Sequence, residues 1–430
     1  MSPGELLNTG IEQARLGFFQ AAIAQFDRVI QLDPTCAKAY YNRGCAYRDL
    51  HNLEAAVQDF SRAIRLNVSF VNAYINRGSA LWALGNSALA MADFNRAVSL
   101  ETTGVKGYGN RGQLRLEMED YDGAIADFTA ALQQQPRFAK IYLRRGLAYL
   151  KQGAHEALAE NRRQAYQQAV ADFDQALQFK PGLAAAYNYR AVACYQLGNF
   201  YQATLDLNQA LVYQPDFVEA YINRGMLRHE LGDCQGAIAD YTTVLELDPS
   251  LQERAYNQTL VGLALASPQE TSGEDTPLNL RFRLADLYSH RGTLRARVGD
   301  ANGAIADLTL AARFNAECAC VYASRGRVFS ELGRQIEAVA DFDKALQLQP
   351  NYALAYCHRG YALYAMQEWA TALEDFDLAI EIDPYLAEAY IGRGNTRIQL
   401  QQDAERSMND FRKALELSWE ISNYKRPRFI

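Results

Sequence analysis

The sequence lacks an apolar run long enough to cross a membrane. Its longest such run, LVGLALA at residues 260–266, has seven residues, whereas a transmembrane helix needs about 20. The first ten residues, MSPGELLNTG, show neither the basic stretch nor the apolar stretch of a secretory signal peptide. We therefore expect no integral membrane segment, and the cytoplasm is the default location.

Motifs for metal, thiol and cofactor chemistry are also scarce. The seven cysteines contain no CxxC pair, so free thiols in a reducing compartment are the simplest interpretation. The five histidines form no HxxxH pair, and neither a GxxxxGK[S/T] phosphate loop, a GxSxG elbow nor an HExxH motif occurs. We predict no metal site, no cofactor and no catalytic residue.

The charge balance argues against nucleic acid as a partner. The formal net charge is −7 at pH 7, whereas proteins that contact phosphate backbones need clustered lysine and arginine. A helical repeat that reads RNA would need a basic groove, and the acidic balance disfavours it.

What the sequence does contain is one template repeated along its length. A 34-residue register beginning at Pro3 usually places tyrosine at repeat position 4, alanine at position 20 and a large apolar residue at position 24. Position 8 is glycine in ten of the eleven copies, and Ala191 occupies it in the other. A period of this length is the signature of stacked helical hairpins. Glycine inside a helix costs roughly 0.5–1 kcal/mol relative to alanine, so close helix packing must offset that cost. The copies begin at residues 3, 37, 71, 105, 139, 184, 218, 285, 319, 353 and 387.

The repeated template resembles the tetratricopeptide repeat family. The second copy carries the first five signature residues, and the sixth, a proline at repeat position 32, appears in seven copies. The resemblance implies an all-α fold, a right-handed α-solenoid of about eleven helix-turn-helix repeats with a concave groove, and it implies no reaction. The five residues are Tyr40, Gly44, Ala56, Phe60 and Ala63, and the prolines are Pro34, Pro136, Pro181, Pro215, Pro249, Pro350 and Pro384.

The register divides the chain into two arrays. Seven copies occupy residues 1–251, a degenerate repeat or loop follows at 252–284, four copies occupy 285–418, and 419–430 form a tail. The fifth copy, 139–183, has eleven extra residues. Eleven residues make about three helical turns, so we predict a longer second helix that protrudes beyond its neighbours.

An arginine at position 7 and an aspartate at position 23 occur together. Both are present in ten copies, and the only copy without the arginine, which has Thr9, also lacks the aspartate and has Gln25. A half-buried arginine needs a partner, and a carboxylate supplies one by accepting two N–H hydrogen bonds from the guanidinium. We interpret the pair as a structural ion pair between the two helices rather than as a ligand site.

Position 6 supplies the candidate peptide-binding residues. A primary amide donates and accepts hydrogen bonds at once, so a row of them along a groove could pair with the backbone of an extended peptide. The alternative is that asparagine merely tolerates a solvated helix face. The candidate amides are Asn8, Asn42, Asn76, Asn110 and Asn223.

Basic and aromatic residues join the amides in the predicted groove. Lys140 and Arg144, with Asn110, fill three of the five roles of the carboxylate clamp found in chaperone cofactors of the resembled family. Ile75 and Ser79 stand where that clamp needs lysine and asparagine, so a preference for an acidic peptide is expected rather than a full clamp. Large aromatic residues are typical interface anchors, and the candidates are Tyr41, Trp82 and Tyr195.

The resemblance implies a non-enzymatic scaffold or adaptor that binds peptide segments of partner proteins in its groove. Assistance in the assembly of a larger complex is one form of that role. Two alternatives stay open: capture of an acidic C-terminal peptide in the manner of a co-chaperone, and service as the regulatory repeat subunit of an enzyme complex.

Overall fold

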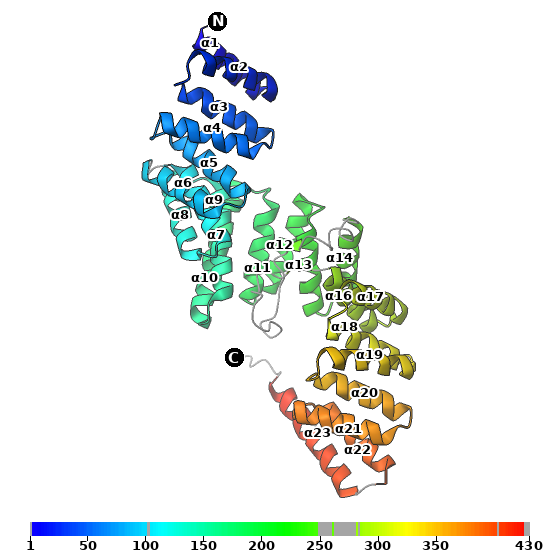
Figure 1. Ribbon diagram of the computed structural model, residues 1–430. Helices are drawn as coiled ribbons and strands as arrows, with labels where there is room; N and C mark the ends of the chain where they lie inside the picture. The colour runs from blue at the N-terminus through cyan, green and yellow to red at the C-terminus, as the bar shows by residue number, and fades with distance from the viewer. Residues whose placement is uncertain are drawn as a thin grey trace. The chain divides into compact units, whose positions relative to one another are not determined.

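The computed structural model describes residues 2–100, 104–247, 260–261, 281–282, 284–401 and 404–424. Within these ranges the helices follow one another in antiparallel pairs joined by short turns (Figure 1). The chain divides into two compact units, Met1–Pro215 and Asp216–Ile430. This all-α repeat architecture confirms the α-solenoid predicted from the sequence.

Unit 1 contains six helical hairpins. Their helices are α1 (Pro3–Arg15), α2 (Phe19–Leu32), α3 (Ala37–Asp49), α4 (Leu53–Leu66), α5 (Val71–Ala83), α6 (Ser87–Leu100), α7 (Val105–Glu117), α8 (Tyr121–Gln134), α9 (Ala139–His155), α10 (Ala159–Phe179), α11 (Ala184–Gln196) and α12 (Phe200–Tyr213).

Unit 2 contains five hairpins in its described residues, together with one pair of two-residue strands. Strand β1 (Leu260–Val261) pairs antiparallel with β2 (Arg281–Phe282). The helices are α13 (Val218–Glu230), α14 (Cys234–Leu247), α16 (Leu284–Arg297), α17 (Ala301–Phe314), α18 (Ala319–Glu331), α19 (Gln335–Leu348), α20 (Ala353–Ala365), α21 (Trp369–Ile382), α22 (Ala387–Gln399) and α23 (Ala404–Tyr424).

Two predicted segments fall largely outside the described residues. Of the degenerate repeat or loop predicted at 252–284, only 260–261, 281–282 and Leu284 are described, and residues 425–430 of the predicted tail lie outside them. Helices α14 and α16 nevertheless contact each other directly. In addition, Arg291 donates to Thr242 Oγ1 at 3.2 Å, although the two residues are 49 positions apart. Therefore α14 and α16 stack as consecutive hairpins do.

Local sequence explains where each hairpin turns. Gly85 follows α5 and has a φ of +80°. Glycine adopts this left-handed backbone conformation without steric cost. The next residue, Asn86, closes the turn by donating its backbone N–H to Leu81 O at 2.8 Å. Second helices often begin at an asparagine or aspartate cap, as where Asn52 accepts from the Ala55 N–H at 3.2 Å. Turn and cap together set the antiparallel pairing.

The position-8 glycines permit close packing against an aromatic ring. A Cβ added at Gly44 would lie 2.9 Å from Cε1 of Phe60 and 3.2 Å from Cβ of Asp59. The ring is completely buried, together with Ala56 and Ala63 of the same helix. The ring at position 24, rather than the alanine at position 20, is therefore what most requires glycine opposite it.

The eleven extra residues of the fifth copy lengthen both helices of one hairpin. Helix α9 has 17 residues and α10 has 21, against 13 and 14 in the neighbouring hairpin of α11 and α12. The prediction of a longer second helix is therefore confirmed, but the first helix grows as well. The extension has its own packed layer, because a Cβ on Gly153 would lie 2.8 Å from Cε1 of Tyr166. We call this extended part of the hairpin, residues 151–166, the overhang.

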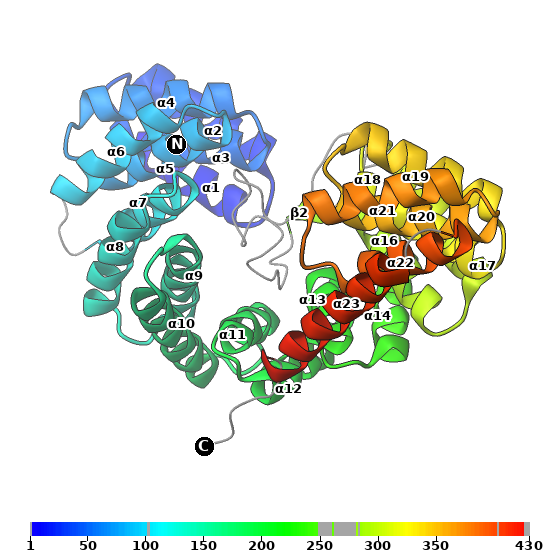
Figure 2. The ribbon, with the colours of Figure 1, turned by 90° about the horizontal axis from the view of Figure 1, so that it is seen from below.

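The first helices of successive hairpins contact one another in unit 1, from α1 through α3, α5, α7 and α9 to α11. In Figure 2, α7 and α9 lie on the inner side of the curve of unit 1, and α8 and α10 on its outer side. We call the side of unit 1 that these first helices line the inner face, and position 6 of each copy lies on these helices.

Candidate functional site

Each described arginine at position 7 holds the aspartate at position 23 of its own hairpin with two donors. In the fourth copy, Arg111 Nε donates to Asp127 Oδ2 at 2.9 Å and Nη2 donates to Oδ1 at 2.5 Å. The guanidinium also lies 5.7 Å from the ring centroid of Tyr108. The structural ion pair predicted from the sequence is confirmed. The pairs are Arg43–Asp59, Arg77–Asp93, Arg111–Asp127, Arg145–Asp172, Arg190–Asp206, Arg224–Asp240, Arg291–Asp307, Arg325–Asp341, Arg359–Asp375 and Arg393–Asp410.

The same arginines reach the preceding hairpin, which sequence reasoning missed. Nη1 of Arg111 donates to Asn95 Oδ1 at 3.0 Å, and Asn95 occupies position 25 of the copy before. The available signal was that position 25 carries a hydrogen-bond acceptor in the ten copies that another copy follows, although the residue type varies. The described acceptors are Asp27, Ser61, Asn95, Thr129, Asp174, Thr242, Thr309, Asp343 and Asp377.

The position-6 amides lie along the inner face with differing exposure. Asn8 is exposed, whereas Asn42, Asn76 and Asn110 are half-buried. Asn223, in unit 2, is only 1% exposed, and its side chain is therefore not part of an accessible surface in this structure.

Two of the half-buried amides link consecutive first helices. Asn76 Nδ2 donates to Tyr41 Oη at 2.9 Å, and Asn76 Oδ1 accepts from Arg48 Nη1 at 3.3 Å. Asn110 Nδ2 donates to Ser79 Oγ at 3.3 Å. These hydrogen bonds use N–H donors that were predicted to bind a peptide. Burial raises the pKa of the Tyr41 hydroxyl to about 12, so the group stays protonated at neutral pH while its oxygen accepts from Asn76.

The third half-buried amide, Asn42, makes its hydrogen bond within its own helix. Asn42 Nδ2 donates to Lys38 O at 2.8 Å, one turn earlier in its own helix. This bond uses one of its two N–H donors, and the carbonyl oxygen of the amide accepts no hydrogen bond from a described side chain or backbone group.

The structure brings Trp82 and Arg144 together through Glu117. Trp82 Nε1 donates to Glu117 Oε2 at 2.9 Å. The Glu117 carboxylate also acts electrostatically on Arg144, where it opposes the burial that lowers the pKa of the guanidinium. Lys140 lies exposed one helical turn before Arg144 on α9. Three consecutive copies therefore contribute an aromatic, an acidic and a basic side chain to one cluster.

Arg144 differs from the arginine next to it. Arg145 donates to Asp172 and to Thr129. Arg144 is half-buried and makes no hydrogen bond to a residue in the described part of the chain. A guanidinium carries five N–H donors and no acceptor, so the donors of Arg144 are available on the inner face.

Tyr195 lies apart from this cluster. Its ring is 5.3 Å from that of Phe200, the first residue of α12, and it is half-buried. The structure thus joins Tyr41 to Asn76, and Trp82 to Arg144, but it does not collect all ten predicted residues into one site.

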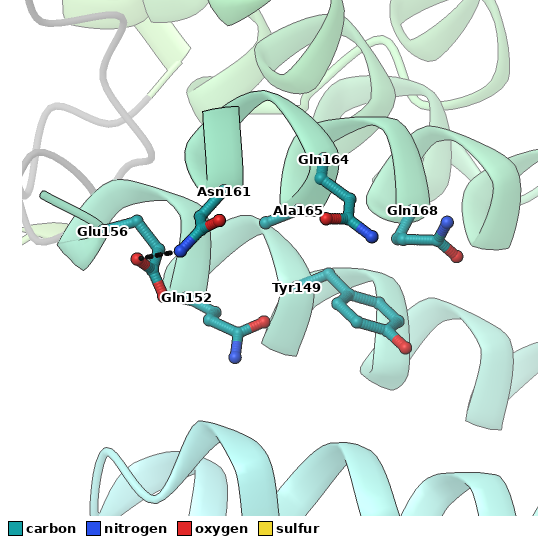
Figure 3. Close-up of a pocket in the computed structure, with 7 residues that line it drawn as sticks. All are labelled: Tyr149, Gln152, Glu156, Asn161, Gln164, Ala165 and Gln168. Atoms are coloured by element: carbon teal, nitrogen blue, oxygen red, sulfur yellow. Dashed lines mark hydrogen bonds between the residues drawn. The ribbon is translucent and has the colours of Figure 1, made fainter. Parts of the chain in front are cut away.

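A pocket of about 310 Å³ opens on the overhang (Figure 3). Most of its lining side chains are polar, and two of them make a weak contact, with Asn161 Nδ2 3.5 Å from Glu156 Oε2. Gln152 reaches back to the preceding hairpin and donates to Asp122 Oδ1 at 2.8 Å. The lining residues are Tyr149, Gln152, Glu156, Asn161, Gln164, Ala165 and Gln168.

Motifs and clusters of other kinds have structural explanations here. Gly107, Gly109 and Gly112 match the spacing GxGxxG, but they lie inside α7 and serve packing, since a Cβ on Gly112 would meet the Phe128 ring at 2.9 Å. In the described residues, no three or more His, Cys, Asp or Glu side chains are grouped so that they could hold a metal ion. None of the described helices is both long and apolar enough to cross a bilayer.

The comparisons with known proteins agree with this architecture. Models of the tetratricopeptide repeat match residues 37–70, 71–103 and 195–251, and a further TPR repeat model matches 112–153 and 326–367. These matches fall on both units. The chain belongs to the tetratricopeptide repeat family.

Solved structures with a similar fold include members of the same family. A tetratricopeptide repeat protein from Parabacteroides merdae is 19% identical in sequence. The match covers 65% of this chain and 93% of that protein, with a TM-score of 0.45. The yeast protein Tom70 is 16% identical, and the match covers 96% of this chain and 92% of Tom70, with a TM-score of 0.36. MamA is 25% identical, and the match covers 40% of this chain and 94% of MamA, with a TM-score of 0.36. A search of curated proteins finds no match.

Family membership indicates a protein–protein interaction scaffold in general terms, because stacked repeats present extended surfaces to partner proteins. Tetratricopeptide repeat arrays are generally non-catalytic.

Proposed function

We propose that the inner face of unit 1 binds an extended peptide segment of a partner protein and that Arg144 anchors a carboxylate of that peptide. The observation that carries this proposal is the half-buried guanidinium of Arg144, which makes no hydrogen bond to a described residue. An arginine and a carboxylate form a bidentate, charge-assisted pair. Lys140, one turn away, adds a second positive charge.

The neighbouring residues suit such a peptide. Glu117 accepts the indole N–H of Trp82 through one oxygen, and no described residue accepts the N–H donors of Arg144. The indole of Trp82 is half-buried and offers a flat apolar surface, of the kind that anchors peptides in binding sites.

The amides extend this site toward the N-terminus of unit 1. Asn42, Asn76 and Asn110 follow at one-hairpin intervals, and each amide has two N–H donors and one carbonyl oxygen. After the internal hydrogen bonds described above, Asn42 and Asn110 each keep a donor and an acceptor for a peptide backbone. Recognition of this kind depends on the main chain, so specificity rests on the acidic group.

In this proposal the chain is an adaptor in the cytoplasm that gathers partner proteins, without nucleic acid, and that takes part in the assembly of a larger complex. A free C-terminal carboxylate and an internal acidic side chain are the two sources of the anchoring group.

The test uses the full chain and two pools of fluorescent ten-residue peptides that end in Asp-Glu, one with a free carboxyl terminus and one amidated. Arg144→Gln should weaken binding by roughly tenfold, which corresponds to the loss of one charged hydrogen-bonded contact. Arg163→Gln is the matched control, because Arg163 is exposed on α10.

Preference for the free carboxyl pool would assign the anchor to a C-terminus, and equal binding of both pools would assign it to side-chain carboxylates. If Arg144→Gln and Arg163→Gln bind the peptides equally well, Arg144 is not the anchor and the proposal fails.

A further inference from the structure

The second helix of each hairpin carries an apolar residue at position 28 that the next hairpin covers. Ile64, Val98 and Leu132 occupy this position and are 7%, 8% and 6% exposed. In the hairpin of α22 and α23 the equivalent residue is Leu415, which is 71% exposed. The last described hairpin therefore presents a surface that the earlier hairpins bury.

Three further residues extend this surface. Ile391 and Ile398 on α22 are 39% and 53% exposed, and Met408 on α23 is 60% exposed. Each helix places its two apolar residues seven positions apart, on one side of the helix. The two sides form one surface, because Tyr41 and Ile64, the equivalents of Ile391 and Leu415 in the second copy, share a cluster with Ala73 of the next hairpin. We call Ile391, Ile398, Met408, Leu415 and the adjacent Arg412 the end face.

The other hairpins show what kind of element fits such a surface. In unit 1 the occupant is the first helix of the next hairpin, whose residue at position 3 packs on position 28. A Cβ added at Gly107, for example, would lie 3.4 Å from Cγ2 of Val98. The occupant is an amphipathic helix, and its arginine donates to the acceptor at position 25 of the hairpin beneath it.

Position 25 of the last described hairpin carries a positively charged donor in place of the hydrogen-bond acceptor found in the earlier hairpins. There the residue is Arg412, which is exposed and donates to Asn409 Oδ1 at 3.0 Å. A further helix of the repeat type would bring its own arginine next to Arg412, and two positive charges placed side by side repel each other. An aspartate or glutamate in the same place would form an ion pair instead.

We propose that the end face docks an amphipathic helix of a partner protein, and that this helix carries an acidic residue where the chain's own first helices carry arginine. The apolar residues of the end face supply the binding energy, and Arg412 selects the charge. This surface lies in unit 2 and is separate from the peptide site proposed for unit 1.

The test uses two 13-residue probes derived from α5, residues 71–83, one with the natural Arg77 and one with Arg77→Glu. Each probe carries a covalent bridge between two outward-facing positions, because an isolated helix of this length is marginally stable in water. Fluorescence anisotropy with the full chain measures both affinities. The acidic probe should bind roughly three- to tenfold more tightly than the arginine probe.

Two variants of the full chain separate the contributions. Arg412→Glu should reverse the order of the two probes. Leu415→Gln should weaken both probes by about tenfold or more, because it removes an apolar contact. The matched control is Ile336→Gln on α19, since Ile336 is 74% exposed and lies outside the end face. Arg412, Leu415 and Ile336 are all exposed, so these substitutions should leave the fold intact.

Failure of both probes to bind, or unchanged preference in Arg412→Glu, would overturn the proposal. It would also be overturned if the chain dimerises in sedimentation experiments and Leu415→Gln abolishes the dimer, because the end face would then join two copies of this chain.

Discussion

Arg111 holds Asp127 through two N–H donors, and its third nitrogen reaches Asn95 in the preceding hairpin. One side chain thus joins the two helices of a hairpin and also joins that hairpin to its neighbour. Asp127 is almost completely buried, and it also accepts from Arg115 Nη1 at 2.9 Å, so two arginines pair with this one carboxylate.

We predict that Arg111→Ala lowers the free energy of unfolding by about 1–3 kcal/mol, because it removes two charged hydrogen bonds to the buried Asp127 carboxylate and leaves only the one from Arg115. The double variant with Asp127→Ala should lose less than the sum of the two single losses. Urea denaturation followed by circular dichroism measures all three variants. Arg96→Ala, at an exposed position of α6, should change stability little, and strict additivity in the cycle would mean that the pair is not a unit.

The packing of Gly112 against Phe128 gives a second prediction. Gly112→Ala should destabilise the chain by about 1–3 kcal/mol, because the new Cβ would lie 2.9 Å from the Phe128 ring and the core cannot expand without strain. This value is the net loss, after the gain of about 1 kcal/mol that alanine brings to a helix relative to glycine. Thermal melting of Gly112→Ala and of Gly4→Ala makes the comparison. Nothing lies within 4 Å of a Cβ at Gly4, so that variant should be neutral or slightly stabilised.

The inner-face asparagines should differ in their effect on stability. Asn76→Ala removes the hydrogen bonds to Tyr41 and from Arg48, so we expect a loss of about 1–2 kcal/mol. Asn42→Ala removes only a bond to a backbone oxygen of its own helix and should cost less than about 0.5 kcal/mol. Chemical denaturation of both variants checks the order. Equal losses would show that the bridge between α3 and α5 contributes nothing.

The thiol of Cys318 should be the most reactive in the described part of the chain at neutral pH. A hydrogen bond from Cys320, whose Sγ lies 2.7 Å away, holds the pKa of Cys318 below its ordinary value. Burial raises the pKa of Cys194 to about 11 and that of Cys357 to about 12. Because the thiolate is the reactive form, a fall in pH should slow alkylation of Cys318 only below neutrality.

Mass spectrometry after brief iodoacetamide treatment at several pH values measures this order. Cys320→Ser replaces the thiol donor with a hydroxyl and keeps a hydrogen bond, whereas Cys320→Ala removes it and should raise the pH at which Cys318 reacts. The prediction is contradicted if Cys194 is modified as fast as Cys318 at pH 7.

Sequence alone predicted the hairpins and the Arg–Asp pairs because the copies repeat the same residues at the same positions. The contact from each arginine to position 25 was harder to predict. Aspartate, serine, asparagine and threonine all accept a hydrogen bond there, so no single residue type marks the position.

The inner face was only partly predictable. Position 6 identified a row of amides, but the spacing says nothing of whether Tyr41, Arg48 or Ser79 reaches them from the adjacent hairpin. The role of Glu117 between Trp82 and Arg144 was missed for the same reason, because contacts between successive first helices depend on side-chain lengths at positions that vary from copy to copy. Whether these residues bind a peptide stays a prediction.

The overhang shows how a hairpin can grow inside an array. Helix α9 gains four residues and α10 gains seven relative to α11 and α12, which at about 100° per residue rotates the added ends by only about 40° and −20° from whole turns. Both helices therefore keep the same sides facing each other, and Gly153 meets Tyr166 as Gly146 meets Phe173 seven residues away on each helix. Length changes of this size alter how far a hairpin projects and leave the neighbouring hairpins in phase, so a single copy can acquire a new surface while the rest of the array continues undisturbed.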